Sequence, residues 1–138
     1  MLMDKFATGV LFGICAVLIL DTGGSVLSQR LKFRYSRLAP ISLLLWGTAA
    51  DMASRGAGND LAGAIVLGGL AGLIVGFFDS TVGWWISWCI GAGRLERESI
   101  TNPKIARTIL TVTMLATAVG ATTVFLVELV GKAIQRTT

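Results

Sequence analysis

The sequence has 138 residues, of which 54% are hydrophobic and only 14% are charged, about half the charge of an ordinary soluble domain. With a mean hydropathy of +0.74, this composition excludes a disordered chain, a soluble nucleic-acid-binding protein and an ordinary soluble enzyme domain. The sequence also lacks histidine, the commonest general base and metal-binding side chain. We therefore expect an all-α integral membrane protein that forms a single domain over residues 1–138.

The first predicted transmembrane span covers residues 6–27 and contains Asp21. Its charged start and apolar run are like a signal peptide, but no small-residue cleavage site follows, so we expect a retained span. Gly9 and Gly13 lie four residues apart and predict a face for close helix packing. Cys15 and Cys89 lack the spacing of a metal or redox site. We expect them to be buried apolar thiols and expect no metal and no cofactor.

A basic segment follows the first span. Its residues are Arg30, Lys32, Arg34 and Arg37. Such charges set the orientation of membrane proteins, and they also attract anionic lipid headgroups. Both roles are compatible, and orientation alone already explains the charges.

The second predicted span covers residues 40–55 and begins at Pro40, which suits the first turn of a helix. It is short and contains Asp51, four residues before Arg55. This spacing places both side chains on the same helical face and favours an ion pair. The alternative is that Asp51 belongs to an ion or proton site.

The third predicted span covers residues 61–88. Gly68, Gly72 and Gly76 recur at every fourth position and form a stripe of small residues, which lets helices approach closely. At 100° per residue, Asp79 falls within roughly 20° of Gly68 around the helix, beside this stripe. Three tryptophans near the end of the span predict an interfacial aromatic belt. They are Trp84, Trp85 and Trp88.

Asp21 and Asp79 are the strongest candidates for an ion or proton site, because ionisable groups within membrane spans usually mark such sites. Each is followed by a hydroxyl residue, Thr22 and Ser80 respectively. We expect the two carboxylates to face a shared polar cavity if the two halves of the chain pack together. The alternative is structural: Asp79 would pair with a neighbouring helix near the headgroups, and Asp21 would mark a frayed helix end.

The fourth predicted span covers residues 105–130 and is rich in threonine, for which we expect mainly packing roles. Each half of the chain then has two spans separated by a basic loop, a pattern that would fit two parallel-repeat helical hairpins. Chance resemblance between two hairpins is the alternative.

Basic residues orient the four predicted spans. Eight of the twelve lie in or beside the loops at 30–37 and 94–107, and four lie on the opposite side. The positive-inside rule therefore predicts that both loops are cytoplasmic and that both termini face outward, as in a bacterial inner membrane.

The functional prediction is a small oligomeric membrane protein that forms a channel-like or transporter-like pathway for a small ion or solute. The glycine stripe would build the interface between subunits. The alternative is a non-transporting accessory or scaffold subunit of a larger membrane complex. The sequence shows no nucleophile or nucleotide-binding motif, so we do not expect an enzyme. We expect the partners to be lipid and membrane proteins, not nucleic acid.

Overall fold

A computed structural model describes residues 2–33, 35–91 and 102–135. These residues are almost entirely helical and contain no β-strand, as the composition predicts. The elements in chain order are α1 (Leu2–Leu31), the 3-10 turn η1 (Tyr35–Leu38), α2 (Ala39–Ser54), the 3-10 turn η2 (Arg55–Ala57), α3 (Leu61–Phe78), the π-helical turn η3 (Asp79–Gly83), α4 (Trp84–Ile90) and α5 (Asn102–Gln135).

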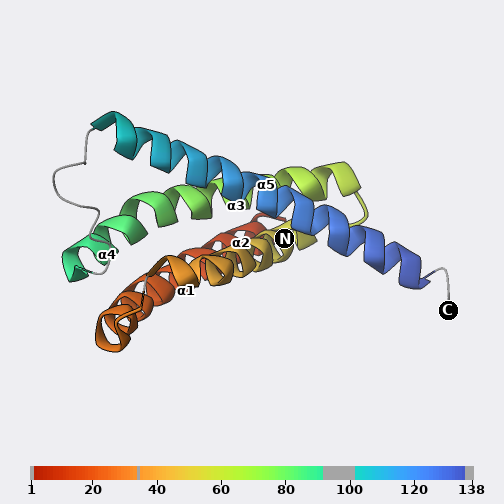
Figure 1. Ribbon diagram of the computed structural model, residues 1–138. Coiled ribbons are helices and arrows are strands. Elements are labelled where there is room, and N and C mark those ends of the chain that lie inside the picture. The colour runs from red at the N-terminus through yellow and green to blue at the C-terminus, as the bar shows by residue number, and fades with distance from the viewer. Residues whose placement is uncertain (1, 34, 92–101, 136–138) are drawn as a thin grey trace.

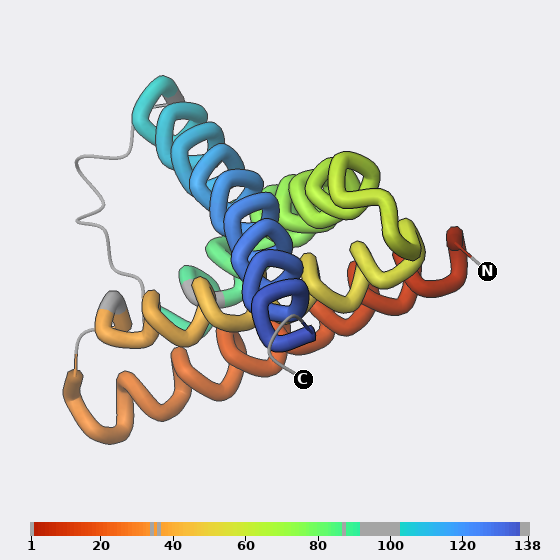
Figure 2. Tube along the Cα trace, turned by 90° about the vertical axis from the view of Figure 1, so that its right-hand side faces the viewer, coloured from red at the N-terminus to blue at the C-terminus, as the bar shows by residue number. Residues whose placement is uncertain are grey.

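The helices run back and forth along the molecule (Figure 1). The helix α2 returns antiparallel along α1, the segment from α3 to α4 runs in the direction of α1, and α5 returns along α3. Seen from the side, α5 crosses the α1–α2 hairpin at a steep angle (Figure 2). The helix α5 packs mainly against α3 and secondly against α2.

Among the described residues, three helical segments are long and apolar enough to cross a membrane: Leu2–Leu31, Leu61–Ile90 and Pro103–Gln135. The predicted span at 40–55 corresponds to α2, which has 16 residues and is about 24 Å long. A straight span needs about 20 residues, so the prediction of four spans is not confirmed. The helix is short because Pro40 lies at its start and because the chain leaves the following turn at Gly58, whose φ is 64°.

Small residues hold α1 against α2 and α3. A methyl group built on Gly9 would lie 2.5 Å from the amide nitrogen of Ala53 and 2.7 Å from the carbonyl oxygen of Ala49. One built on Gly13 would lie 2.7 Å from a methyl group of Val75 on α3. Gly9 therefore brings the backbones of α1 and α2 into close contact, and Gly13 leaves room for the side chain of Val75.

The glycine stripe of α3 faces α5 of the same chain. A methyl group on Gly68 would meet Val124 at 2.5 Å, and Gly72 and Gly76 both face Ala116. On the opposite side of this contact, Gly120 of α5 faces the carbonyl oxygen of Gly68. The expectation that the stripe builds an interface between subunits is therefore wrong, because α5 already covers it.

The π-helical turn η3 separates α3 from α4. The hydroxyl groups of Ser80 and Thr81 both donate hydrogen bonds to the carbonyl oxygen of Phe77, at 3.1 and 2.6 Å. Side-chain hydroxyls that bond to the preceding turn bend helices, and single π turns often occur at functional sites. The third apolar stretch therefore changes its helical geometry at Asp79, where the sequence places its most informative acidic residue.

The two cysteines differ from the expectation of buried thiols. Cys15 and Cys89 are both free and both exposed on the surface of the chain. They share that surface with many large apolar side chains of α1, α3 and α5. An apolar outer surface and a core of small residues are the arrangement expected where lipid replaces water as the solvent.

Candidate functional site

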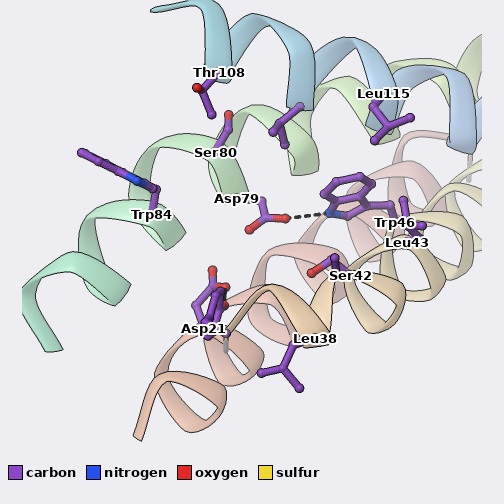
Figure 3. A pocket seen from close by; sticks show the side chains of 13 residues that line it. Asp21, Leu38, Ser42, Leu43, Trp46, Asp79, Ser80, Trp84, Thr108 and Leu115 are labelled. Atoms are coloured by element: carbon purple, nitrogen blue, oxygen red, sulfur yellow. Dashed lines mark hydrogen bonds between the residues drawn. The ribbon is translucent and has the colours of Figure 1, made fainter. Parts of the chain in front are cut away.

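A cavity of about 360 Å³ lies between α2, η3 and the N-terminal half of α5. Figure 3 shows Asp79 near its centre and Asp21 on the side of α1. Most of its wall is apolar, and its polar groups come from a few side chains. These are Asp21, Tyr35, Ser42, Trp46, Asp79, Ser80, Trp84 and Thr108.

The cavity exists because α5 contacts α2 over only part of its length. The two helices meet where Gly47 faces Thr123 and where Gly120 faces Ala50. From this crossing the N-terminal half of α5 diverges from α2 (Figure 1). The wedge between them is lined on the α5 side by Thr108, Val112 and Leu115.

Asp79 is the first residue of the π-helical turn and points towards α2 (Figure 3). The indole Nε1 of Trp46 donates a hydrogen bond of 3.0 Å to Asp79 Oδ2. Trp46 is 4% exposed, so its ring forms part of the core while its N–H group reaches the cavity. The neighbouring Ser80 faces α5, where its hydroxyl lies 3.5 Å from Thr113 Oγ1.

Asp21 is more deeply buried than Asp79, with only 3% of its surface exposed. The hydroxyl of Tyr35 donates a hydrogen bond to Asp21 Oδ1. The second oxygen, Oδ2, is buried and accepts no hydrogen bond within the described residues. Buried carboxylate oxygens are normally paired because burial without a donor is costly, so this atom marks an incomplete site.

The two carboxyl groups meet at Gly83, the last residue of the π-helical turn. A methyl group built on Gly83 would collide with Asp21 Oδ2 and lie 3.1 Å from Asp79 Oδ1. Gly83 therefore provides the space in which the pair forms.

The carboxylate pair lies in a cavity that neither lysine nor arginine lines, within the part of the chain that the structure describes. Two ionised carboxylates in such a place repel each other and lack compensation for their lost hydration. A proton shared by the pair, or a cation that enters the cavity, would relieve both effects.

Two of the predicted site residues lie elsewhere. Asp51 pairs with Arg55, with 2.7 Å between Asp51 Oδ2 and Arg55 Nη2, which is the same-face ion pair that the spacing favoured. Thr22 is exposed on α1, because a helix turns by 100° per residue and carries it away from the direction of Asp21. Neither residue lines the cavity, so the structure does not bring them together with Asp21 and Asp79.

The predicted interface residues are only partly placed. Arg30, Lys32 and Arg37 are exposed, whereas Arg34 and the loop residues 92–101 lie outside the described residues. Trp84 lines the cavity and stacks on Trp88, with ring centroids 6.4 Å apart. The expected contacts with headgroups and the aromatic belt stay predictions.

Tyr35, Trp46 and Gly83 are the site residues that sequence reasoning did not identify. Trp46 is separate from the tryptophans at 84–88 and lies in the middle of an apolar helix. An indole N–H in such a position needs an acceptor, and this was an available signal. Tyr35 and Gly83 carried no comparable signal, because both meet Asp21 only in the folded chain.

Replacing Trp46 with phenylalanine should lower the stability of the protein in detergent by about 2 kcal/mol, because a partly buried carboxyl oxygen of Asp79 loses its hydrogen-bond donor. The phenyl ring retains most of the apolar packing. Thermal unfolding followed by circular dichroism measures the change. Trp85, which is 58% exposed, gives the matched control Trp85→Phe, and an equal loss of stability in both variants would contradict the prediction.

Comparison of the chain with protein-family models, with curated proteins and with solved structures finds no match.

Proposed function

We propose that this chain is a multi-pass membrane protein that provides a pathway for a small ion or solute, with Asp21 and Asp79 as its binding site. The observation that carries the proposal is the buried carboxylate pair, which faces a cavity whose described lining contains no basic side chain. Ionisable groups within membrane spans are costly and are usually retained for transport or proton exchange.

The proposed membrane topology uses the three apolar segments as spans, and the shorter α2 carries the chain back across the membrane between α1 and α3. In this topology both termini lie on one side of the membrane. The basic segment at 30–37 and the loop at 94–107 lie on the other side, which the positive-inside rule makes cytoplasmic. A bacterial inner membrane is the setting in which this orientation applies most directly.

A homo-oligomer is part of the proposal, because a chain of this size rarely encloses a complete pathway alone. The glycine stripe is covered by α5, so contacts between subunits would use another surface. The C-terminal half of α5 projects beyond the other helices (Figure 1) and exposes Leu126, Leu129, Val130 and Ile134.

Flux measured in proteoliposomes tests the proposed site. We expect Asp79→Asn to abolish cation- or proton-dependent flux while the protein still assembles, because the variant removes charge from the pair. Asp60→Asn is the matched control: Asp60 caps α3 through the amide nitrogen of Ala62, at 3.1 Å, and asparagine caps helices equally well. Unchanged flux in Asp79→Asn would contradict the site.

The exposed apolar half of α5 also favours a second candidate, a non-transporting subunit of a larger membrane complex. This surface would then contact a different protein. Purification in a mild detergent discriminates between the two functions. A stable homo-oligomer supports the pathway, and a single copy that co-purifies with a larger membrane protein supports the accessory subunit.

A further inference from the structure

We propose that the ligand of the cavity is an organic cation with an apolar body, of the alkylammonium or quaternary ammonium class. The inference specifies the substrate class of the site described under the proposed function and rests on that function for its role in transport. Binding itself needs only the cavity.

The charge of the ligand follows from the carboxylate pair. Asp21 is 3% exposed and has one buried oxygen without a donor, and Asp79 Oδ1 lies close to the same point beside Gly83. The described lining includes no basic side chain. A bound positive charge would therefore be attracted by both carboxylates without competition from a resident cation.

The apolar body follows from the rest of the wall. Aliphatic side chains and the two tryptophans surround the acidic centre on both sides: Leu38, Leu43, Trp46, Trp84, Val112 and Leu115. Figure 3 shows Trp46 and Trp84 on opposite sides of Asp79. Apolar pockets with a few polar groups are typical of sites for organic ligands, and indole rings attract cations through their faces.

A bare metal ion fits the site poorly, because the described residues hold no cluster of three or more carboxylate, imidazole or thiol groups. Asp21 and Asp79 are the acidic side chains of the cavity lining. Calcium takes six to eight oxygen ligands, whereas an organic cation needs only the field of the carboxylates and contact with the apolar wall.

The cavity volume of about 360 Å³ lies near the lower end of the range for sites of small organic ligands. A cation with one aromatic ring, such as benzyltrimethylammonium, is a suitable probe. A neutral molecule of similar size and good solubility, N-benzylacetamide, is the matched ligand. The two probes separate the contribution of charge from the contribution of apolar contact.

Isothermal titration calorimetry on the full chain in detergent tests the proposal. We expect benzyltrimethylammonium to bind about tenfold or more tightly than N-benzylacetamide, and we expect Asp79→Asn and Asp21→Asn each to weaken its binding by a similar factor. Asp60→Asn should bind like the unmodified chain. The comparison of the two ligands on the unmodified chain needs no variant, so it holds even if a carboxylate variant fails to fold.

The failure of this inference can be told apart from the failure of the proposed function. Equal binding of the two probes, or equal binding by Asp79→Asn, overturns the organic-cation inference. If the organic-cation inference fails in this way but potassium or protons still cross the membrane in an Asp79-dependent manner, the proposed pathway stands with a different substrate. Charge-dependent binding without flux supports the organic-cation site and overturns the pathway.

Discussion

Replacing Gly83 with alanine is expected to abolish cation binding and Asp79-dependent flux while the helices stay folded. The added methyl group would occupy the position of Asp21 Oδ2 and would lie 3.1 Å from Asp79 Oδ1. The two carboxyl groups would have to separate, so the site would lose the geometry that concentrates its negative charge. Calorimetry with benzyltrimethylammonium and flux in proteoliposomes measure the loss, which we expect to exceed about tenfold in affinity.

The expected effect of Gly83→Ala on helix stability distinguishes a loss of the site from misfolding of the chain. Alanine favours helix over glycine by about 1 kcal/mol, so Gly83→Ala should retain the helical content of the unmodified chain. The control is Gly131→Ala on α5, where no atom lies within 4 Å of the added methyl group. Normal binding by Gly83→Ala would show that the pair does not depend on the space at Gly83.

Replacing Gly72 with leucine should have the largest effect on stability, a loss of about 3 kcal/mol, because overpacked residues cannot relax freely. The first atom of the new side chain would lie 3.0 Å from the carbonyl carbon of Ala116 and 3.3 Å from Thr117 Cα. Both are backbone atoms of α5, so the helices would have to move apart. Reversible unfolding in mixed detergent micelles gives the free energy of unfolding.

Gly23→Leu is the matched control for this substitution. Gly23 lies within α1, and no atom lies within 4 Å of a methyl group built on it. Both variants gain the same side chain and the same helix propensity, so their difference isolates the contact between α3 and α5. A comparable loss of stability in both variants would show that this close contact does not limit stability.

The helical elements followed from the sequence because the apolar stretches and their boundaries are local properties. Pro40 lies at the start of α2, and Asp60 caps α3 as the turn residues around it predict. The number of membrane spans could not be predicted from the sequence with the same clarity. The helix α2 has only 16 residues, and its buried alanines show that it serves as a packing surface between longer helices.

The candidate site was only half predictable from the sequence. The spacing of apolar stretches placed Asp21 and Asp79 within helices, and their proximity then depended on how the two hairpins pack. The hydrogen-bond donors to these carboxylates lie outside the helices that carry them: Tyr35 is 14 residues from Asp21, and Trp46 is 33 residues from Asp79. Gly83 could not be predicted for the same reason, because its role depends on its contact with Asp21, a side chain of α1.

The two carboxylates of the pair come from different parts of the chain, and this has a mechanical consequence. Asp21 belongs to the hairpin of α1 and α2, and Asp79 belongs to the segment that joins α3 to α4. In the proposed site, repulsion between unneutralised carboxylates would push these two halves apart, and a bound positive charge would draw them together. Because such coupling is reciprocal, any restraint that holds the halves together also tightens ligand binding. A crosslink between the two hairpins would therefore act on affinity without touching the ligand.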